Sequence, residues 1–342
     1  MKPFLGLFAH WDVVTRQEPP KFLGKYFSAK SDSEIFIAKN LHSRISSSLS
    51  NPQRIIGGNA ANAAVALSEL DIPCVLSCPA RPKNLMAELS KHRIFLMSGG
   101  RETSTLRCAR PEEEPEHMIF ERECYRKIFN YDTVERSFLL DQDFWDSIGD
   151  ASYMFLSGFQ TIPERQKKKV KEIADLLEKR RFKVHLELGY GKNLMKYAIK
   201  KLVERNCIDS IGMNETELPI LGIKERAPKE TAESMVLFMA ENGLERMSLH
   251  TREYRISVFR KDSERNEKAA ELSIQACAAK ALGGIRENMR KAGTAPFSRV
   301  RPLKGEDFFI IPTRIVEKPK IIVGLGDAAA VTDSFYAMKK SV

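Results

Sequence analysis

A carboxylate stands just where a helix is expected to begin near the C-terminus. The stretch GLGDAAAVTDSF places Asp327 directly after Gly324 and Gly326 and before a run of small residues. The start of a helix has free N–H groups and the positive end of the helix dipole, and phosphate is the anion most often bound there. An acid beside such a phosphate cradle indicates phosphoryl transfer, with Asp327 facing the attacking hydroxyl. The alternative is an ordinary capped helix after a glycine turn, since Asp is a good N-cap.

A second glycine-rich stretch could hold a sugar. In GGNAANAAVALSEL, Gly57 and Gly58 allow the backbone to approach a ligand closely, and Asn59 can both donate and accept hydrogen bonds to vicinal hydroxyls. Asp12, directly after the first apolar segment, could accept hydrogen bonds from two more hydroxyls. The alternatives are a turn before a tightly packed helix and an exposed aspartate at a strand end. The spacing does not match the GxGxxG dinucleotide motif.

Two further pairs of polar residues could serve a metal ion. In HLEL, His185 and Glu187 alternate onto one face of an expected strand, unless this strand simply lies at a sheet edge. In SIGMNETEL, Asn214 and Glu217 lie three residues apart in the first turn of an expected helix. Glu217 could hold magnesium, mainly through water, beside phosphates. The same pair also resembles a helix capping box, and both interpretations can hold in one structure.

Short apolar strands alternate with longer amphipathic helices along the chain. We therefore expect one α/β domain over residues 1–342, with a mainly parallel sheet flanked by helices and ligands at the carboxyl ends of the strands. Residues 101–130 break the pattern and contain the short alternating segment HMIFE. We expect this segment, with about residues 13–30, to form a small β lid. Helical spacing is expected over SEIFIAKNLHSRISSSLS, and a last strand over KPKIIVG.

Composition excludes several classes of protein. The chain of 342 residues has a formal net charge of +10, which suits nucleic-acid binding or an enzyme for anionic substrates. Its basic residues are spread out, with no zinc-finger or basic-zipper pattern, so we expect no nucleic-acid partner. The apolar runs are too short to span a bilayer, and the six cysteines form no CxxC pair. A cytoplasmic protein without a membrane partner, as a monomer or homodimer, is expected.

Taken in order along the chain, these motifs resemble a known family. Asp12, GGNAANAA, HLE, NETE and GLGD follow the order of the ribokinase superfamily, and HMIFE, FLSGFQ, HLEL, SIGMNETEL, LHT and VGLGD resemble its archaeal ADP-dependent phosphofructokinase and glucokinase branch. The resemblance covers the chain from about Phe8 onward. It implies a Rossmann-like ribokinase fold with a β lid, and transfer of the β-phosphate of ADP to a sugar or sugar phosphate with magnesium. The fructose 6-phosphate and glucose classes of acceptor both stay open.

The resemblance also implies roles for individual residues. Asp327 resembles the catalytic base, and Gly324 and Gly326 the anion hole. The sugar contacts are expected at Asp12, Gly57, Gly58, Asn59 and Gln160. The nucleotide is expected at His250, Thr251 and Val323. The magnesium motifs are expected at Asn214, Glu217, His185 and Glu187.

The sequence departs from the family at two places. Ala328 to Ala330 follow Asp327 where the family tends to have Thr and Ser, and His10 and Trp11 stand where it prefers Asn and small residues. Arg122 and Arg126 are basic residues in the expected lid that could bind a phosphate group, so they slightly favour a phosphorylated sugar as the acceptor. An ATP-dependent ribokinase-like kinase of sugars or nucleosides, or a non-catalytic sugar or nucleotide sensor, are the alternatives.

Overall fold

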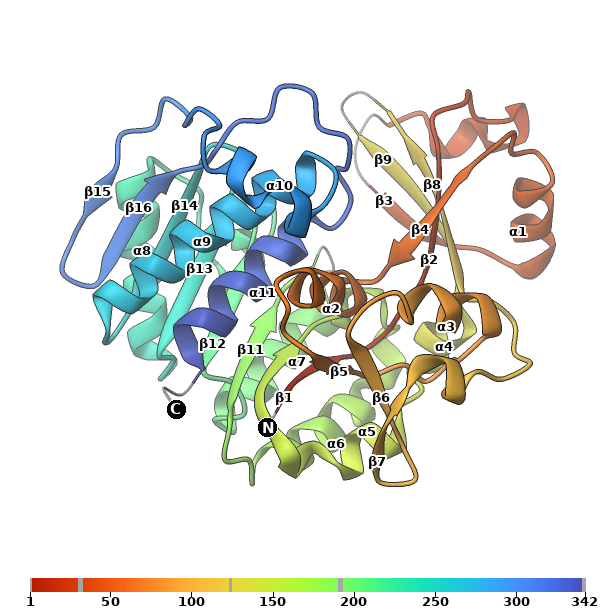
Figure 1. Ribbon diagram of the computed structural model, residues 1–342, viewed down its shortest axis with the longest axis horizontal. Helices are drawn as coiled ribbons and strands as arrows, with labels where there is room; N and C mark the ends of the chain where they lie inside the picture. Colours follow the sequence, from red (N-terminus) through yellow and green to blue (C-terminus); the bar gives the residue numbers. More distant parts are fainter. Residues whose placement is uncertain (1, 30–32, 123–124, 190–192, 340–342) are drawn as a thin grey trace.

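A large twisted sheet forms the centre of the protein in the computed structural model, which describes residues 2–29, 33–122, 125–189 and 193–339. The central strands from β13 across to β6 run parallel, and antiparallel strands extend both edges (Figure 1). The eleven strands lie in the order β15 (Leu303–Lys304), β16 (Phe308–Pro312), β14 (Tyr254–Phe259), β13 (Arg246–His250), β12 (Ser210–Met213), β11 (Lys183–Glu187), β10 (Ala151–Leu156), β1 (Lys2–Gly6), β5 (Cys74–Leu76), β6 (Ile94–Ser98) and β7 (Arg101–Ser104).

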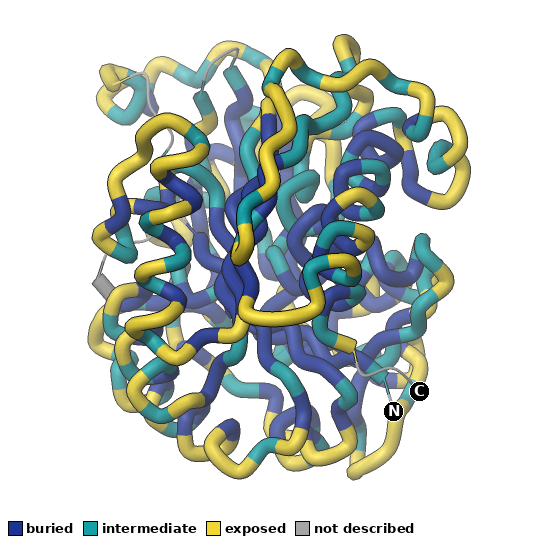
Figure 2. The backbone as a smooth tube through the Cα atoms, turned by 90° about the vertical axis from the view of Figure 1, so that its left-hand side faces the viewer, coloured by how far each residue is buried: buried dark blue, intermediate teal, exposed yellow. Residues whose placement is uncertain are grey.

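Helices cover both faces of this sheet, because successive strand residues point to opposite sides. Phe4 belongs to one buried cluster and its neighbour Leu5 to the other. Buried strands fill the interior, while the outer sides of the helices are exposed (Figure 2). The first cluster packs against α5 (Gln142–Asp146), α6 (Lys167–Leu177), α7 (Asn193–Glu204) and α8 (Pro228–Glu241). The second packs against α2 (Asn59–Glu69), α3 (Lys83–Leu89), α9 (Ser263–Ala281), α10 (Ile285–Ala292) and α11 (Leu325–Met338).

A smaller five-stranded sheet, called here the lid sheet, stands beside the large one (Figure 1). Its strands lie in the order β3 (Ser33–Phe36), β9 (Arg126–Tyr131), β8 (Glu116–Glu121), β2 (His10–Thr15) and β4 (Gln53–Gly57). One face packs apolar side chains against the 3₁₀ helix η1 (Lys21–Tyr26), α1 (Lys39–Ser46) and the ring of Phe27, which contacts Phe120 and Phe129. The opposite face is turned toward the large sheet.

The α/β architecture with a mainly parallel sheet is confirmed. Of the two segments expected in the lid, 13–30 supplies part of β2 and η1, and 101–130 supplies β8 and most of β9; residues 30 and 123–124 lie outside the described residues. Arg101–Ser104 instead forms β7 at the edge of the large sheet.

Two smaller predictions about secondary structure were wrong. Ser33–Phe36 forms strand β3, which pairs with β9, so the helix expected there begins only at Lys39. Residues 318–324, KPKIIVG, do not form the expected last strand but run irregularly to α11. None of the helices in the described part of the chain combines the length and apolar character needed to cross a membrane.

Candidate functional site

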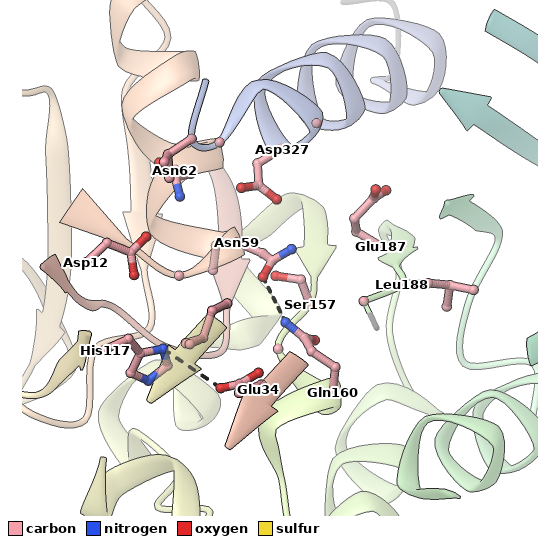
Figure 3. A pocket seen from close by; sticks show the side chains of 18 of the residues that line it. Asp12, Glu34, Asn59, Asn62, His117, Ser157, Gln160, Glu187, Leu188 and Asp327 are labelled. Atoms are coloured by element: carbon pink, nitrogen blue, oxygen red, sulfur yellow. Dashed lines mark hydrogen bonds and ion pairs between the residues drawn. The ribbon is translucent and has the colours of Figure 1, made fainter. Parts of the chain in front are cut away.

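A cavity of about 640 Å³ opens between the lid sheet and the carboxyl ends of the parallel strands (Figure 3). Most of the residues singled out from the sequence line it, from segments more than 300 residues apart: Asp12, Gly58, Asn59, Gln160, Glu187, Asn214, Glu217, His250, Val323, Gly324, Gly326 and Asp327. Three others, Gly57, His185 and Thr251, are not among its lining residues. The fold therefore gathers at one place the polar groups that the sequence motifs had indicated separately.

Asp327 lies in the first turn of α11 and points into the cavity (Figure 3). Burial raises the pKa of its carboxyl group to about 6, although the charge of Lys280 and a hydrogen bond from Asn59 work in the opposite direction. Asn59 in turn accepts a hydrogen bond from Gln160, with 2.9 Å between Gln160 Nε2 and Asn59 Oδ1. A fixed chain of side chains thus holds the carboxylate, and its pKa suits exchange of a proton near neutral pH.

The turn before α11 requires glycine at position 324, because the surrounding side chains leave no space for a Cβ atom there. Gly324 adopts φ +68°, a left-handed conformation that residues with a side chain rarely adopt. Its carbonyl oxygen accepts a hydrogen bond of 3.0 Å from Lys280 Nζ, and a Cβ atom added there would lie 2.5 Å from Asn62 Oδ1. Lys280 is buried on α9, and burial lowers its pKa while Asp327 opposes the shift. Lys280 and Asn62 therefore fix the start of α11.

The three alanines after Asp327 have a packing role. Ala328, Ala329 and Ala330 are 0%, 5% and 0% exposed, and α11 lies directly against α9 and α2. Larger or polar side chains would push these helices apart. The departure from the family at Ala328–Ala330 leaves the backbone N–H groups of the first turn in place.

The first turn of α2 faces the same cavity, so two helix N-termini meet there. Their N–H groups and dipoles favour a bound anion. Gly57 pairs with His10 across β4 and β2, and a Cβ atom at Gly57 would come within 2.4 Å of Asp12 Oδ1. Gly57 does not line the cavity but leaves the space that the Asp12 carboxylate occupies.

Acidic groups gather at the ends of β11 and β12. Burial raises the pKa of Glu187 well above its usual value, and the neighbouring charges of Glu217 and Asp327 add to the shift. Burial also raises the pKa of Glu217 to about 7, despite hydrogen bonds of 2.9 Å from the backbone and side-chain nitrogens of Asn214. Carboxylates that destabilise one another in this way would be stabilised by a bound cation.

The two histidines near this acidic group are not equivalent. His185 is fully buried, and its Nε2 lies 3.0 Å from Glu187 Oε2 while its Nδ1 lies 3.0 Å from Ser210 Oγ. His185 therefore orients the Glu187 carboxylate by this contact without itself lining the cavity. His250 reaches the cavity with Nε2 3.6 Å from Glu187 Oε1, and burial lowers its pKa to about 3, so it is neutral near pH 7.

Thr251 and Arg122 lie away from the cavity lining. The Thr251 hydroxyl closes the β13–β14 turn, donating to Tyr254 O at 2.9 Å. Arg122 donates to Glu18 at 3.0 Å on the surface of the lid. Arg126, by contrast, lines the cavity.

The structure adds residues that the motifs did not indicate. Glu34 on β3, His117 on β8 and Glu135 line the lid side of the cavity, and Lys280 and Asn62 support the turn before α11. The sequence marks two of these residues only weakly. His117 is a polar residue in the alternating strand HMIFE, and Lys280 is a lysine in the alanine-rich stretch QACAAKA. Their positions depend on pairing between distant strands.

Comparisons with known proteins point in the same direction. The model of the ADP-specific phosphofructokinase/glucokinase conserved region matches residues 21–335. An ADP-dependent glucose/glucosamine kinase of Pyrococcus furiosus is 27% identical over 255 residues, covering 61% of this chain and 56% of that protein. The matches span about half the length of the curated relatives.

Solved structures share the fold. An ADP-dependent kinase in complex with fructose-6-phosphate and ADPβS superposes with a TM-score of 0.80 at 18% identity, covering 99% of this chain and 95% of the other. A phosphofructokinase from Pyrococcus horikoshii with AMP gives a TM-score of 0.77 at 18% identity, with 98% and 97% covered.

Proposed function

Because this chain belongs to the ADP-specific phosphofructokinase and glucokinase family, we propose that it transfers the β-phosphate of ADP to a sugar hydroxyl. The bond between the β-phosphorus and the bridging oxygen breaks, AMP leaves, and the sugar oxygen forms the new P–O bond. The proton of the hydroxyl passes to Asp327. The observation that carries this proposal is the Asp327 carboxylate, held in a helix first turn at the centre of the cavity by Asn59 and facing its acidic lid side.

Asp327 acts as the base, and its neighbours prepare the anion site. Phosphoryl transfer has a loose transition state, so catalysis is mostly positioning and charge stabilisation, and Asp327 need not be strongly basic. The N–H groups of the first turn after Gly324 would stabilise the charge that develops on the phosphoryl oxygens. Lys280 keeps this turn in place and lowers the pKa of Asp327.

Magnesium is expected at the acidic group formed by Glu187, Glu217 and Asn214. Oxygen donors are the ligands that Mg²⁺ prefers, and the raised pKa values of both glutamates indicate that this site gains stability from a cation. Bound magnesium would neutralise charge on the phosphates of ADP. His185 would keep Glu187 oriented, and the neutral His250 would lie beside the nucleotide together with Val323.

An unphosphorylated hexose or hexosamine is the acceptor that this site favours. Asp12 and Glu34 contribute carboxylates to the lid side of the cavity, and among the described lining residues Arg126 is the only lysine or arginine. Carboxylates accept hydrogen bonds from hydroxyl or ammonium groups but repel a phosphate dianion. The curated relatives are named as glucose/glucosamine kinases. For these reasons our proposal places glucose or glucosamine ahead of a sugar phosphate, which stays the alternative because Arg126 lines the cavity and a structural neighbour is a complex with fructose-6-phosphate.

A cytoplasmic location is part of the same proposal. The described cysteines, Cys74, Cys78, Cys108, Cys207 and Cys277, are free thiols, as expected in a reducing compartment; Cys124 lies outside the described residues. The monomer and the homodimer both remain predictions, to be distinguished by light scattering of the purified chain.

The test is a matrix of donors and acceptors. ADP and ATP are each combined with magnesium and glucose, glucosamine, fructose 6-phosphate, ribose and nucleosides, and nucleotide products are separated by chromatography. We expect AMP from ADP with glucose or glucosamine. Turnover only with ATP would assign the chain to ATP-dependent kinases, and ADP binding without any turnover would favour a sensor.

Asp327→Asn provides the matched control for the base. We expect turnover to fall by about 10²–10⁴-fold, the usual contribution of a general base. The same variant should be more stable than the wild type at pH 8, because it removes a buried carboxylate whose pKa is raised. Near-normal turnover would refute the role of Asp327, and the stability measurement separates this result from misfolding.

A further inference from the structure

Lys280 is a buried cation directly behind the turn that begins α11. It lies in the last turn of α9, which packs against α11 (Figure 1), and it is 7% exposed. Its Nζ atom donates a hydrogen bond of 3.0 Å to the carbonyl oxygen of Gly324. A Cβ atom added to Gly324 would lie 2.7 Å from this Nζ atom, so the ammonium group contacts the turn itself. Lys280 is not among the described residues that line the cavity, and it can therefore act on a ligand only through the turn.

The charge of Lys280 has no close counter-charge in the fold. Arg81, another buried cation, pairs with Asp141 at 2.9 Å. Among the residues that the structure describes, no carboxylate forms an ion pair with Lys280. Burial lowers the pKa of its ammonium group, and the more distant charges of Asp327 and Glu69 only oppose that shift. An unpaired buried charge destabilises a fold, so packing alone would favour an apolar side chain at this position.

Hydrogen bonding of the turn does not require Lys280 either. The carbonyl oxygen of Gly324 also accepts the first hydrogen bond of α11, from Ala328 N at 3.1 Å. A buried carbonyl group with one partner is already satisfied, so the lysine is a second donor to it. What a neutral residue could not supply here is positive charge. The charge is therefore the property of Lys280 that needs an explanation.

The peptide group that Lys280 contacts continues into the proposed anion site. The Gly324 carbonyl and the N–H of Leu325 belong to one peptide unit, and Leu325 is the first residue of α11 and lines the cavity. Its N–H is one of the free donors at the start of the helix. Hydrogen-bonded groups in series polarise one another, so an ammonium group on the carbonyl makes this N–H a stronger donor.

The charge of Lys280 is large compared with the dipole of α11. A helix N-terminus is equivalent to roughly half a positive charge. Lys280 adds a full charge one peptide group away, in a buried place where water and salt screen it little. Three carboxylates, on Glu187, Glu217 and Asp327, line the same cavity and repel a phosphate. The helix dipole alone is weak against them, whereas a buried ammonium group offsets one of these charges.

We propose that Lys280 is a positioning residue for the phosphoryl donor: through the Gly324–Leu325 peptide it strengthens the anion site at the start of α11, and the bound β-phosphate is its counter-charge. This role rests on the proposed transfer of phosphate from ADP. It applies equally to a sugar and to a sugar phosphate as the acceptor. Binding of ADP should depend on Lys280 more than binding of AMP does, because AMP has no β-phosphate to place at this site.

The test measures nucleotide affinity without turnover. ADP and AMP are each titrated into the full chain by isothermal titration calorimetry, with magnesium and without any sugar. Lys280→Met removes the charge and the hydrogen bond at similar side-chain length, and Lys280→Gln removes the charge but retains a donor. We expect both variants to bind ADP about 10–100-fold more weakly, the range typical of hydrogen bonds to charged groups, and AMP less than about threefold more weakly.

Lys268→Met is the matched control, because it removes the same charge from the exposed side of the same helix. Lys268 pairs with Glu264 at the surface, and its Met variant should bind ADP as the wild type does. The loss in Lys280→Met should persist in about 0.5 M potassium chloride, since a buried charge is screened little. Ligand-free Lys280→Met should melt within about 3 °C of the wild type, because removal of a buried charge offsets the lost hydrogen bond.

Three results would overturn the role of Lys280. One is an ADP affinity of Lys280→Met equal to that of the wild type. Another is an equal loss of affinity for ADP and AMP, which would mean that the lysine only holds the turn in shape. The third is normal ADP affinity in Lys280→Gln, which would assign the effect to the hydrogen bond. Wild-type protein that binds neither nucleotide would refute the proposed function itself and, with it, the counter-charge of Lys280, so the wild type distinguishes the two failures.

Discussion

Replacing Gly324 with Ala tests whether the start of α11 is held in one position by its surroundings. The added Cβ atom would lie 2.5 Å from Asn62 Oδ1 and 2.7 Å from Lys280 Nζ, much closer than normal contacts. Its φ of +68° also places a side chain in the left-handed region. The substitution therefore introduces both conformational strain and steric overlap at the proposed anion site.

The expected cost is the sum of these two effects. The left-handed conformation costs about 1–2 kcal/mol for a residue with a side chain, and overpacking of a buried site about 1–3 kcal/mol. The free energy of unfolding should thus fall by roughly 2–5 kcal/mol, lowering the melting temperature of a chain of this length by roughly 3–7 °C. Because a displacement of about 1 Å can cost roughly 100-fold in rate, turnover should fall by about that factor even where the variant is folded.

Gly100→Ala is the matched control, because it has the strain without the overlap. Gly100 has φ +72°, lies in the turn between β6 and β7, and an added Cβ atom would meet nothing within 4 Å. We expect it to lose only about 1–2 kcal/mol and to keep its turnover. Urea unfolding and steady-state kinetics measure both quantities. Equal losses of stability in the two variants, or normal turnover in folded Gly324→Ala, would refute the fixed start of α11.

Three further predictions follow from charges in and beside the site. Turnover should rise with pH through about 6 as Asp327 ionises, and Lys280→Met should move this acidic limb to higher pH, because it removes a cation that lowers the pKa of Asp327; an unmoved limb would contradict this coupling. Glu217→Gln should raise the magnesium concentration for half-maximal turnover by about tenfold, whereas an unchanged magnesium curve would mean that Glu217 only caps its turn. Asp333→Asn should destabilise the fold by about 3–5 kcal/mol in urea unfolding at pH 7, because Asp333 is the buried partner of Arg246 and Arg255. Those arginines lower the pKa of Asp333, so its contribution is complete above pH 3.8 and is lost as pH falls below that value.

The large sheet and much of the site could be predicted from sequence because both follow from local patterns. Apolar strands alternating with amphipathic helices require a parallel sheet, and the carboxyl ends of its strands meet at one edge. Asp327, Glu187 and Asn214 each follow or end a strand or begin a helix, so their positions along the chain already imply that they come together. The motifs that contain these residues also follow one another in the order typical of a known family. The match of the family model over residues 21–335 confirms that family.

The lid sheet could not be predicted in the same way. Its five strands come from four separate stretches between His10 and Tyr131, and β3 has apolar spacing that also fits a helix. Ile35 lies in β3 only because this strand pairs in parallel with β9, nearly a hundred residues later. Such pairing is a tertiary effect that outweighs local propensity. Residues whose roles depend on it, including Glu34, His117 and Glu135, were missed for this reason.

The distribution of charge is the reason for proposing that one end of the cavity binds phosphates and the other a neutral sugar. Two helix N-termini, α2 and α11, present N–H groups to the same volume and need an anion to satisfy them. Glu187, Glu217 and Asp327 lie nearby, and each has a raised pKa because burial and the neighbouring acids oppose its charge. A phosphate alone would worsen this repulsion and a cation alone would leave the helix ends unpaired. The magnesium–nucleotide complex that we propose would satisfy both groups at once, and Asp12 and Glu34 at the lid side would then accept hydrogen bonds from sugar hydroxyls.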